Sequence, residues 1–237
     1  PCLLLLMLLS SLTSLAIGSV SVPIFAGLHD WIVAKPSLAA IVIGEIRLPR
    51  TLIALAVGAA LGLSGAALQG LLRNPLADPS LTGASQGAAL GAAGVFYFGL
   101  MPGLGVLAPG VAGLIGAGAA LLLRLALAGS ARPHMVIMAG LAISTLGGAA
   151  LATVLNFAPN PYAMQELVFW LLGSVSERGL DHLWLLLPAL ALGAALIFSQ
   201  RRLLSALSLG EQVAQSLGFN YQRGSRLIVL GAAVLVG

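Results

Sequence analysis

Charged residues are scarce in this sequence. Asp, Glu, Lys and Arg make up 8% of its 237 residues, whereas a soluble domain usually carries about 25%. Aromatic residues are also few, at 5%. So few charges could not cover a water-facing surface, which excludes an ordinary soluble domain. The net charge of +4 does not indicate nucleic-acid binding, because the basic residues stand singly or in pairs between apolar runs.

Cysteine and metal-ligand clusters are nearly absent. Cys2 is the single cysteine, so a disulfide within the chain is excluded. The three histidines, His29, His134 and His182, have no Cys, Asp or Glu at metal-ligand spacing. A phosphate-binding glycine loop followed by Lys-Ser or Lys-Thr is also missing. We therefore expect no metal, no cofactor and no ATPase in this chain, so ATP-driven transport would need a separate motor subunit.

Long apolar runs are what the sequence has in place of charge. The mean hydropathy is +1.05, and a bilayer core of about 30 Å needs roughly 20 apolar residues per helix. The runs are rich in Leu and Ala and lack the alternation of strands, which predicts an all-α fold, a polytopic transmembrane helix bundle. This criterion finds seven runs, the last of which is cut short: Leu3–Val22, Arg50–Leu72, Thr82–Leu100, Leu104–Ala128, His134–Phe157, Leu183–Ser199 and Ser225–Gly237.

The same length criterion applies to the two ends of the chain. Leu3–Val20 has neither the basic n-region nor the cleavage site of a signal peptide, so a first span is favoured. The sequence begins at Pro1 and stops inside an apolar run at Gly237. We expect the chain to be trimmed at both ends. We also expect residues 1–237 to form a single transmembrane domain.

The segments between the runs differ in character. Residues 27–49 are expected to form a long connection, and 74–79 a tight loop bounded by prolines. Residues 158–181 are predicted to contain a short amphipathic helix near 163–172. Residues 200–224 are the most polar stretch and predict two very short helices, separated by Gly210 and Gly218.

The loop charges predict the orientation. Lys and Arg fall seven to four on alternate sides, which places the richer side in the cytoplasm. The richer side holds Arg73, Arg124, Arg132, Arg201, Arg202, Arg223 and Arg226, and the other holds Lys35, Arg47, Arg50 and Arg178.

Residues inside the runs separate three classes of membrane protein. No Asp, Glu or Lys lies within the spans, which disfavours an ion-coupled secondary transporter. The segment Gly62-Leu-Ser-Gly65 is similar to the nucleophile motif of intramembrane serine proteases, but no histidine lies at membrane depth to act as its base. Small residues four apart on the second and third runs predict close helix packing, with sliding of one helix as the alternative.

Several segments, taken together, resemble the FecCD-like permeases of type II ABC importers for iron–siderophore, haem and cobalamin. They follow in order along the chain as Gly44-Glu-Ile-Arg-Leu-Pro-Arg50, Gly65-Ala-Ala-Leu-Gln-Gly70, Arg73-Asn-Pro-Leu-Ala-Asp-Pro79, Gly83-Ala-Ser-Gln-Gly-Ala-Ala-Leu-Gly91, Trp170-Leu-Leu-Gly-Ser174 and Leu207-Ser-Leu-Gly-Glu-Gln-Val-Ala-Gln-Ser-Leu-Gly218. The resemblance implies about ten helices per permease, of which this chain holds about seven. It also implies a homodimer in the bacterial inner membrane, two cytoplasmic ATPase subunits, a periplasmic or extracellular binding protein and a metal-chelate substrate.

The resemblance also implies roles for three groups of residues. The ATPase-coupling group, within residues 200–224, is Leu207, Ser208, Leu209, Gly210, Glu211, Gln212, Ala214, Leu217 and Gly218. The pair that docks the binding protein is Arg47 and Arg50, and the cytoplasmic gate is Asn74, Leu76, Pro133 and His134. Each group has a plainer alternative: a solvated loop for the first, headgroup anchoring for the second and an ordinary turn for the third.

Overall fold

The computed structural model describes the chain except residues 1, 19, 129–132, 158–160 and 177, together with the side chains of 81, 125, 128 and 133–137. The chain forms two compact units. Unit 1 comprises residues 1–58 and 174–188, and unit 2 comprises 59–173 and 189–237.

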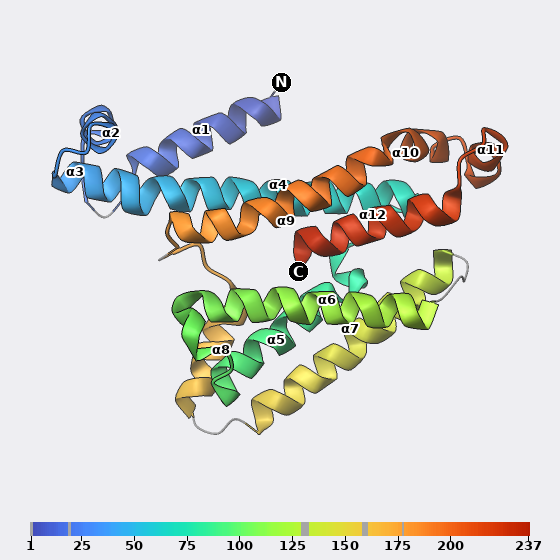
Figure 1. The fold of residues 1–237 in the computed structure, drawn as a ribbon. Helices are drawn as coiled ribbons and strands as arrows, with labels where there is room; N and C mark the ends of the chain where they lie inside the picture. Colours follow the sequence, from blue (N-terminus) through green and yellow to red (C-terminus); the bar gives the residue numbers. More distant parts are fainter. Residues whose placement is uncertain (1, 19, 129–132, 158–160, 177) are drawn as a thin grey trace. The chain divides into compact units, whose positions relative to one another are not determined.

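A helix lies at each of the seven predicted apolar runs (Figure 1). The described residues form no strand, so the all-α prediction is confirmed. Among the described residues, four stretches are long and apolar enough to cross a membrane: 38–72, 102–124, 138–156 and 180–199. The helices at the seven runs are α1 (Cys2–Ala16), α4 (Leu48–Leu72), α5 (Ala84–Phe98), α6 (Ala108–Ala128), α7 (Pro133–Asn156), α9 (Leu180–Ser199) and α12 (Tyr221–Val236).

Unit 1 differs from the expected long connection between the first two runs. This connection folds into α2 (Ile24–Ile32), α3 (Leu38–Ile41) and a π-helical segment, η1 (Val42–Arg47), which continues into α4. Pro49 has no N–H to donate to the Glu45 carbonyl, and its ring crowds that carbonyl. The wider π-helical turns lie at this carbonyl and let the helix run on through the proline.

Two glycines allow α2 to lie against the next helical segment. A Cβ on Gly27 would lie 2.8 Å from the Ala39 carbonyl oxygen, and a Cβ on Gly44 would overlap the Trp31 indole. The short helices are therefore stabilised by contact with each other, since isolated helices of this length are not stable in water.

In unit 2, α5 and α6 cross with their backbones in contact. A Cβ on Gly87 or Gly91 of α5 would overlap the carbonyl oxygens of Gly116 or Ala112 of α6. The small residues predicted on the third run thus form a tight helix crossing. On the second run the result differs, because Gly58 and Gly62 have no described atom within 4 Å of their Cβ positions. The short helix α8 (Pro161–Leu172) joins α5 through an edge-to-face contact of Trp170 with Phe96, whose ring centroids are 6.3 Å apart.

A second group of helices in unit 2 shares one buried apolar cluster. It joins the end of α4 to α9, α10 (Arg201–Leu207), α11 (Glu211–Ser216) and α12. Two short 3-10 segments, η2 (Pro79–Thr82) and η3 (Pro102–Leu107), complete the elements. Members of the cluster include Leu68, Leu71, Ala77, Ile197, Leu203, Leu207, Ala214, Tyr221 and Ile228.

Candidate functional site

The α10–α11 segment of unit 2 is held to the core by buried residues of both helices. Leu207 and Ala214 are fully buried in the cluster that contains the end of α4 and α12. Between them the chain turns at Gly210, whose φ of 116° and ψ of 156° favour a residue without a side chain. Gly218, with φ of 87°, ends the segment in the same manner. Between Leu207 and Gly218, the side chains other than Ala214 are therefore exposed or half-buried.

The outward side chains of this segment include three large apolar ones. Leu209 is 68% exposed, Val213 42% and Leu217 60%. Ser208 and Gln212 are exposed beside them. Exposed apolar residues that gather on a polar segment mark a contact surface. Val213 is absent from the coupling group predicted from sequence, although its four-residue spacing from Leu209 and Leu217 is a signal that could have found it.

A depression of about 610 Å³ lies beside this surface. Arg73, at the end of α4, and Glu211 line it from opposite elements, so it carries charges of both signs. Gln215 donates to Glu211 across one turn of α11, with 3.2 Å between Nε2 and Oε1. The depression and the three apolar side chains together can receive a partner surface that combines apolar groups with charges.

The proline-bounded loop after α4 is ordered by its own side chains. Asn74 accepts a hydrogen bond at Oδ1 from the Leu76 N–H at 2.9 Å, which is an Asx turn, and Gln69 donates to the Pro75 carbonyl at 3.1 Å. Leu76 is 85% exposed at the tip, while Ala77 is buried. The loop is therefore a stiff knuckle with one apolar side chain at its apex.

Asp78 closes this loop and caps η2. Its Oδ1 accepts from the Ser80 N–H at 2.7 Å. Hydrogen bonds from the Ser80 hydroxyl and backbone lower the pKa of Asp78 below its ordinary value of 3.8. The carboxylate is thus charged at neutral pH.

The other two gate residues predicted from sequence, Pro133 and His134, are described by their backbone alone. α7 begins at Pro133. The side chains of Pro133 and His134 lie outside the described residues.

Arg47 occupies a place that the sequence did not predict. It is 5% exposed, and its guanidinium donates to the carbonyls at the end of α1. Nη1 lies 2.8 Å from Leu15 O and 3.0 Å from Ala16 O, and Nη2 donates to Val20 O. A cation at a helix C-terminus satisfies unpaired carbonyls and the helix dipole. In unit 1, Arg47 therefore has a structural role that the docking expectation did not include.

Arg50, the second expected docking residue, is half-buried. Within the described part of the chain its Nε is buried and meets no hydrogen-bond acceptor. The structure thus places the two arginines in different surroundings, although both lie at the start of one helix.

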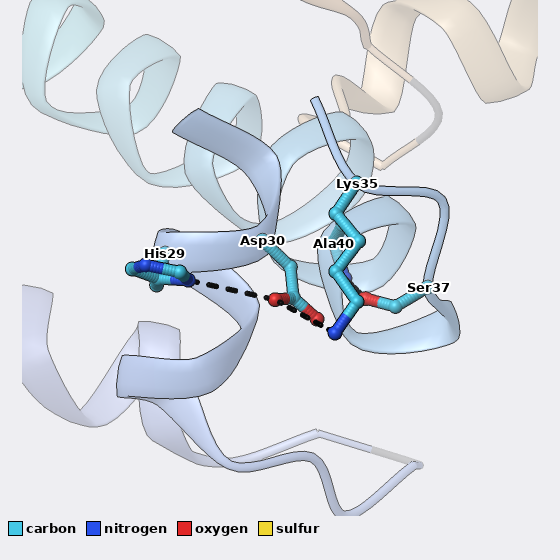
Figure 2. A network of polar contacts seen from close by, with 5 residues as sticks. All are labelled: His29, Asp30, Lys35, Ser37 and Ala40. Carbon is cyan, nitrogen blue, oxygen red and sulfur yellow. Dashed lines mark hydrogen bonds and ion pairs between the residues drawn. The ribbon is translucent and has the colours of Figure 1, made fainter. Parts of the chain in front are cut away.

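Near these arginines in sequence, α2 and the turn after it carry a small polar network (Figure 2). Asp30 Oδ1 lies 3.6 Å from His29 Nδ1 and 3.9 Å from Lys35 Nζ. The Ser37 hydroxyl contributes most to lowering the pKa of Asp30, followed by the positive charge of Lys35. Ser37 also caps α3, since its Oγ accepts from Ala40 N at 3.1 Å. The network fixes the turn between α2 and α3.

Ser64 is the serine of the motif that is similar to intramembrane proteases. Ser64 is fully buried and donates to the Leu61 carbonyl of its own helix at 3.0 Å, which fits a packing residue. Among the described residues there is no group of three or more His, Cys, Asp or Glu side chains that could hold a metal ion.

Comparison with known proteins adds to this geometry. The model of the FecCD transport family matches residues 4–237. An uncharacterized ABC transporter permease protein of Bacillus subtilis, YvrB, is 36% identical over 198 residues, covering 81% of this chain and 56% of its own length. The vitamin B12 import system permease protein BtuC of Klebsiella pneumoniae is 34% identical over 237 residues, covering 98% of this chain and 68% of its own. The chain thus spans between just over half and about two thirds of these curated relatives.

The same likeness holds in three dimensions. A solved ABC transporter, assigned to the metal-chelate type and captured in an inward-facing conformation, superposes with a TM-score of 0.83. Its sequence is 28% identical, and the match covers 99% of this chain and 72% of that one.

Proposed function

This chain belongs to the FecCD transport family, and we propose that it works as the membrane-spanning permease subunit of an ATP-driven, binding-protein-dependent importer of a metal chelate. The related proteins are permease subunits of ABC importers, which are transport subunits and not enzymes. The complete transporter would contain two copies of the permease, two cytoplasmic ATPase subunits and an external binding protein. It would lie in a bacterial inner membrane.

The observation that carries the proposal is the surface formed by α10, the Gly210 turn and α11. Leu207 and Ala214 hold this segment to the end of α4 and to α12, while Leu209, Val213 and Leu217 are exposed. An exposed apolar surface on a rigid, polar segment is suited to a groove in a partner protein. We assign that partner as the ATPase subunit.

The proposed mechanism needs no covalent chemistry in this chain. ATP binding and hydrolysis in the partner would displace α11, and the buried contacts of Leu207 and Ala214 would carry that displacement to α4 and α12. The knuckle at Asn74 and Leu76, with Pro133 and His134, would form the gate at the cytoplasmic end of the pathway. Such coupling depends on packed elements with two discrete arrangements.

On the external side of the membrane, Arg50 is a better candidate than Arg47 for docking the binding protein. Arg47 already donates to three backbone carbonyls of its own chain, so its guanidinium has less capacity for a partner. Arginines at such an interface set the association rate and register.

The substrate class is inferred from relatives. Two BtuC proteins are named for vitamin B12 or cobalamin import, and the structural neighbour is assigned to the metal-chelate type. We therefore propose a bulky metal chelate, with cobalamin tested first and an iron–siderophore and haem beside it. Uptake of each ligand into proteoliposomes with the cognate binding protein and ATPase would identify the cargo.

One substitution tests the coupling surface. Val213→Asp places a carboxylate where we expect an apolar contact, and burial of an unpaired charge costs several kcal/mol. We expect ATPase binding to weaken at least about tenfold, with uptake falling in parallel. Ser174→Asp is the matched control, because it adds the same charge at an exposed loop and keeps an acceptor for the Ser176 N–H.

Two outcomes would count against the proposal. If the Val213→Asp protein kept its thermal stability and bound the ATPase as tightly as the wild type, the assignment of this surface to ATPase coupling would be wrong. Uptake that a proton ionophore abolishes in vesicles loaded with ATP would instead favour an ion-coupled secondary transporter.

A further inference from the structure

The segment η2 follows directly after the knuckle at Asn74 and Leu76. It packs against α5, α7 and α12, all within unit 2. Thr82, its last residue, is buried, and Gly83 follows with φ of 80°. A Cβ on Gly83 would lie 2.9 Å from the Ile143 side chain of α7, so the backbone here lies directly on that helix.

Two side chains from other helices bind the backbone of η2. Ser144 of α7 donates from Oγ to the Ser80 carbonyl at 2.8 Å. Arg124 of α6, which is fully buried, lies with Nη1 3.4 Å from the Thr82 carbonyl. Both carbonyls belong to the four-residue segment, so α6 and α7 hold it at two points.

η2 also contacts elements that lead to the proposed coupling segment. α12 packs on η2 and starts directly after α11, where Asn220 Oδ1 caps it by accepting from the Arg223 N–H at 2.9 Å. Ala77, next to Asp78, lies in the same buried cluster as Leu207 and Ala214. η2 therefore contacts both α12, which would receive the ATPase motion, and the helices α5 and α7, while α12 also packs directly on α5 and α6.

We propose that Ser144 and Arg124 are positioning residues, which pin η2 to α7 and α6 so that motion of α11 and α12 displaces the Asn74–Leu76 knuckle in a defined direction. This proposal rests on the proposed function. Without these two hydrogen bonds, η2 would not move in a fixed direction when α12 moves. ATP would then be hydrolysed without a matching movement of the gate.

The test uses three variants of α7 in the assembled transporter. Ser144→Ala removes the hydroxyl that binds η2, and Ser144→Thr restores one. Thr145→Ala is the matched control, because its hydroxyl donates to Leu141 O within α7 itself, at 2.9 Å. Arg124 is left unchanged, since replacing a fully buried arginine could prevent folding.

Two readouts distinguish positioning from a general loss of stability. The first is substrate transported per ATP hydrolysed in proteoliposomes. The second is the labelling rate of Leu76→Cys by a membrane-impermeant maleimide, with and without ATP, in a Cys2→Ser background that leaves this as the single thiol. For Ser144→Ala we expect unchanged ATPase binding, a coupling ratio lower by about fivefold, the factor that a hydrogen bond of ~1 kcal/mol represents, and a labelling rate that no longer responds to ATP.

Ser144→Thr is expected to recover both readouts, and Thr145→Ala to match the wild type. A Ser144→Ala transporter with a normal coupling ratio and normal ATP-dependent labelling would overturn the positioning role alone. A wild-type protein without ATP-driven uptake would overturn the proposed function, and this proposal with it.

Discussion

Gly18 and Arg47 lie so close that a Cβ on residue 18 would stand 2.6 Å from Nη2 of the arginine. The same guanidinium donates to the Leu15 and Ala16 carbonyls that end α1. Ser14 adds a hydroxyl contact with Thr51 at 2.9 Å, one turn further along α4. The end of α1 is thus attached to the start of α4 by polar contacts that need a glycine beside them.

Gly18→Ala is predicted to destabilise the protein by about 1–3 kcal/mol, because the methyl group displaces the Arg47 guanidinium from its carbonyls. Gly58→Ala is the control, since no described atom lies within 4 Å of its Cβ position. Thermal unfolding of the protein in detergent measures both. An equal Tm for the two variants would contradict the Arg47 contact.

Substitutions of Arg47 and Arg50 are predicted to have different effects on stability and on docking of the binding protein. Arg47→Lys should lower Tm, because one ammonium replaces a planar fork that reaches three carbonyls, while hydrogen bonds to charged groups contribute about 1.5–3 kcal/mol. Arg50→Glu should leave Tm nearly unchanged and slow association of the binding protein, with a weaker salt dependence. Surface plasmon resonance on the reconstituted permease measures the rates, and loss of docking in the Arg47→Lys protein without loss of stability would reverse the assignment.

The α5–α6 crossing is predicted not to tolerate an added methyl group at Gly91. Gly91→Ala would push against the Ala112 carbonyl and should cost about 1–3 kcal/mol. Gly62→Ala on α4 is the matched control in open space. Guanidinium or heat unfolding followed by tryptophan fluorescence compares them, and similar stability of both variants would show that the helices can separate at little cost.

Asp78 is predicted to give a pH-dependent contribution. Its folded-state pKa lies below the ordinary 3.8, so the stabilisation is present above about pH 4 and is lost as the pH falls through the folded pKa. Asp78→Ala should cost at most about 1 kcal/mol at pH 7, because the carboxylate is exposed and screened by solvent. The difference in Tm from wild type should shrink between pH 5 and about pH 3, and a constant difference over that range would argue against the charged cap.

Hydropathy predicted the position of the long helices because each must bury its own backbone in lipid. It missed α2 and η1, which depend on contacts between Gly27 and Ala39 and between Trp31 and Gly44. Pro49 marked a break in sequence, although the π-helical turns before it keep the helix continuous. Short helices of this kind are decided by tertiary packing, which a single sequence does not contain.

The charged residues show the same limit. Arg124 was counted with the loop charges, yet it is fully buried on α6, and Arg47 was expected to dock a partner, yet it is buried against the end of α1. Both donate to backbone carbonyls, which every residue carries and no sequence pattern reveals. The two short helices α10 and α11 were easier to predict, because two glycines and a polar composition mark their segment directly.

The Arg124–Thr82 contact also bears on how the chain enters the membrane. A central arginine costs about 2.5–3.5 kcal/mol on insertion of a helix, and less near the end of a span such as 102–124. Thr82 lies 42 residues before Arg124, so the ribosome has already made the accepting carbonyl when α6 emerges. A circular permutant that makes α6 before η2 would insert that helix before the Thr82 carbonyl exists, so the order of synthesis decides when this contact can form.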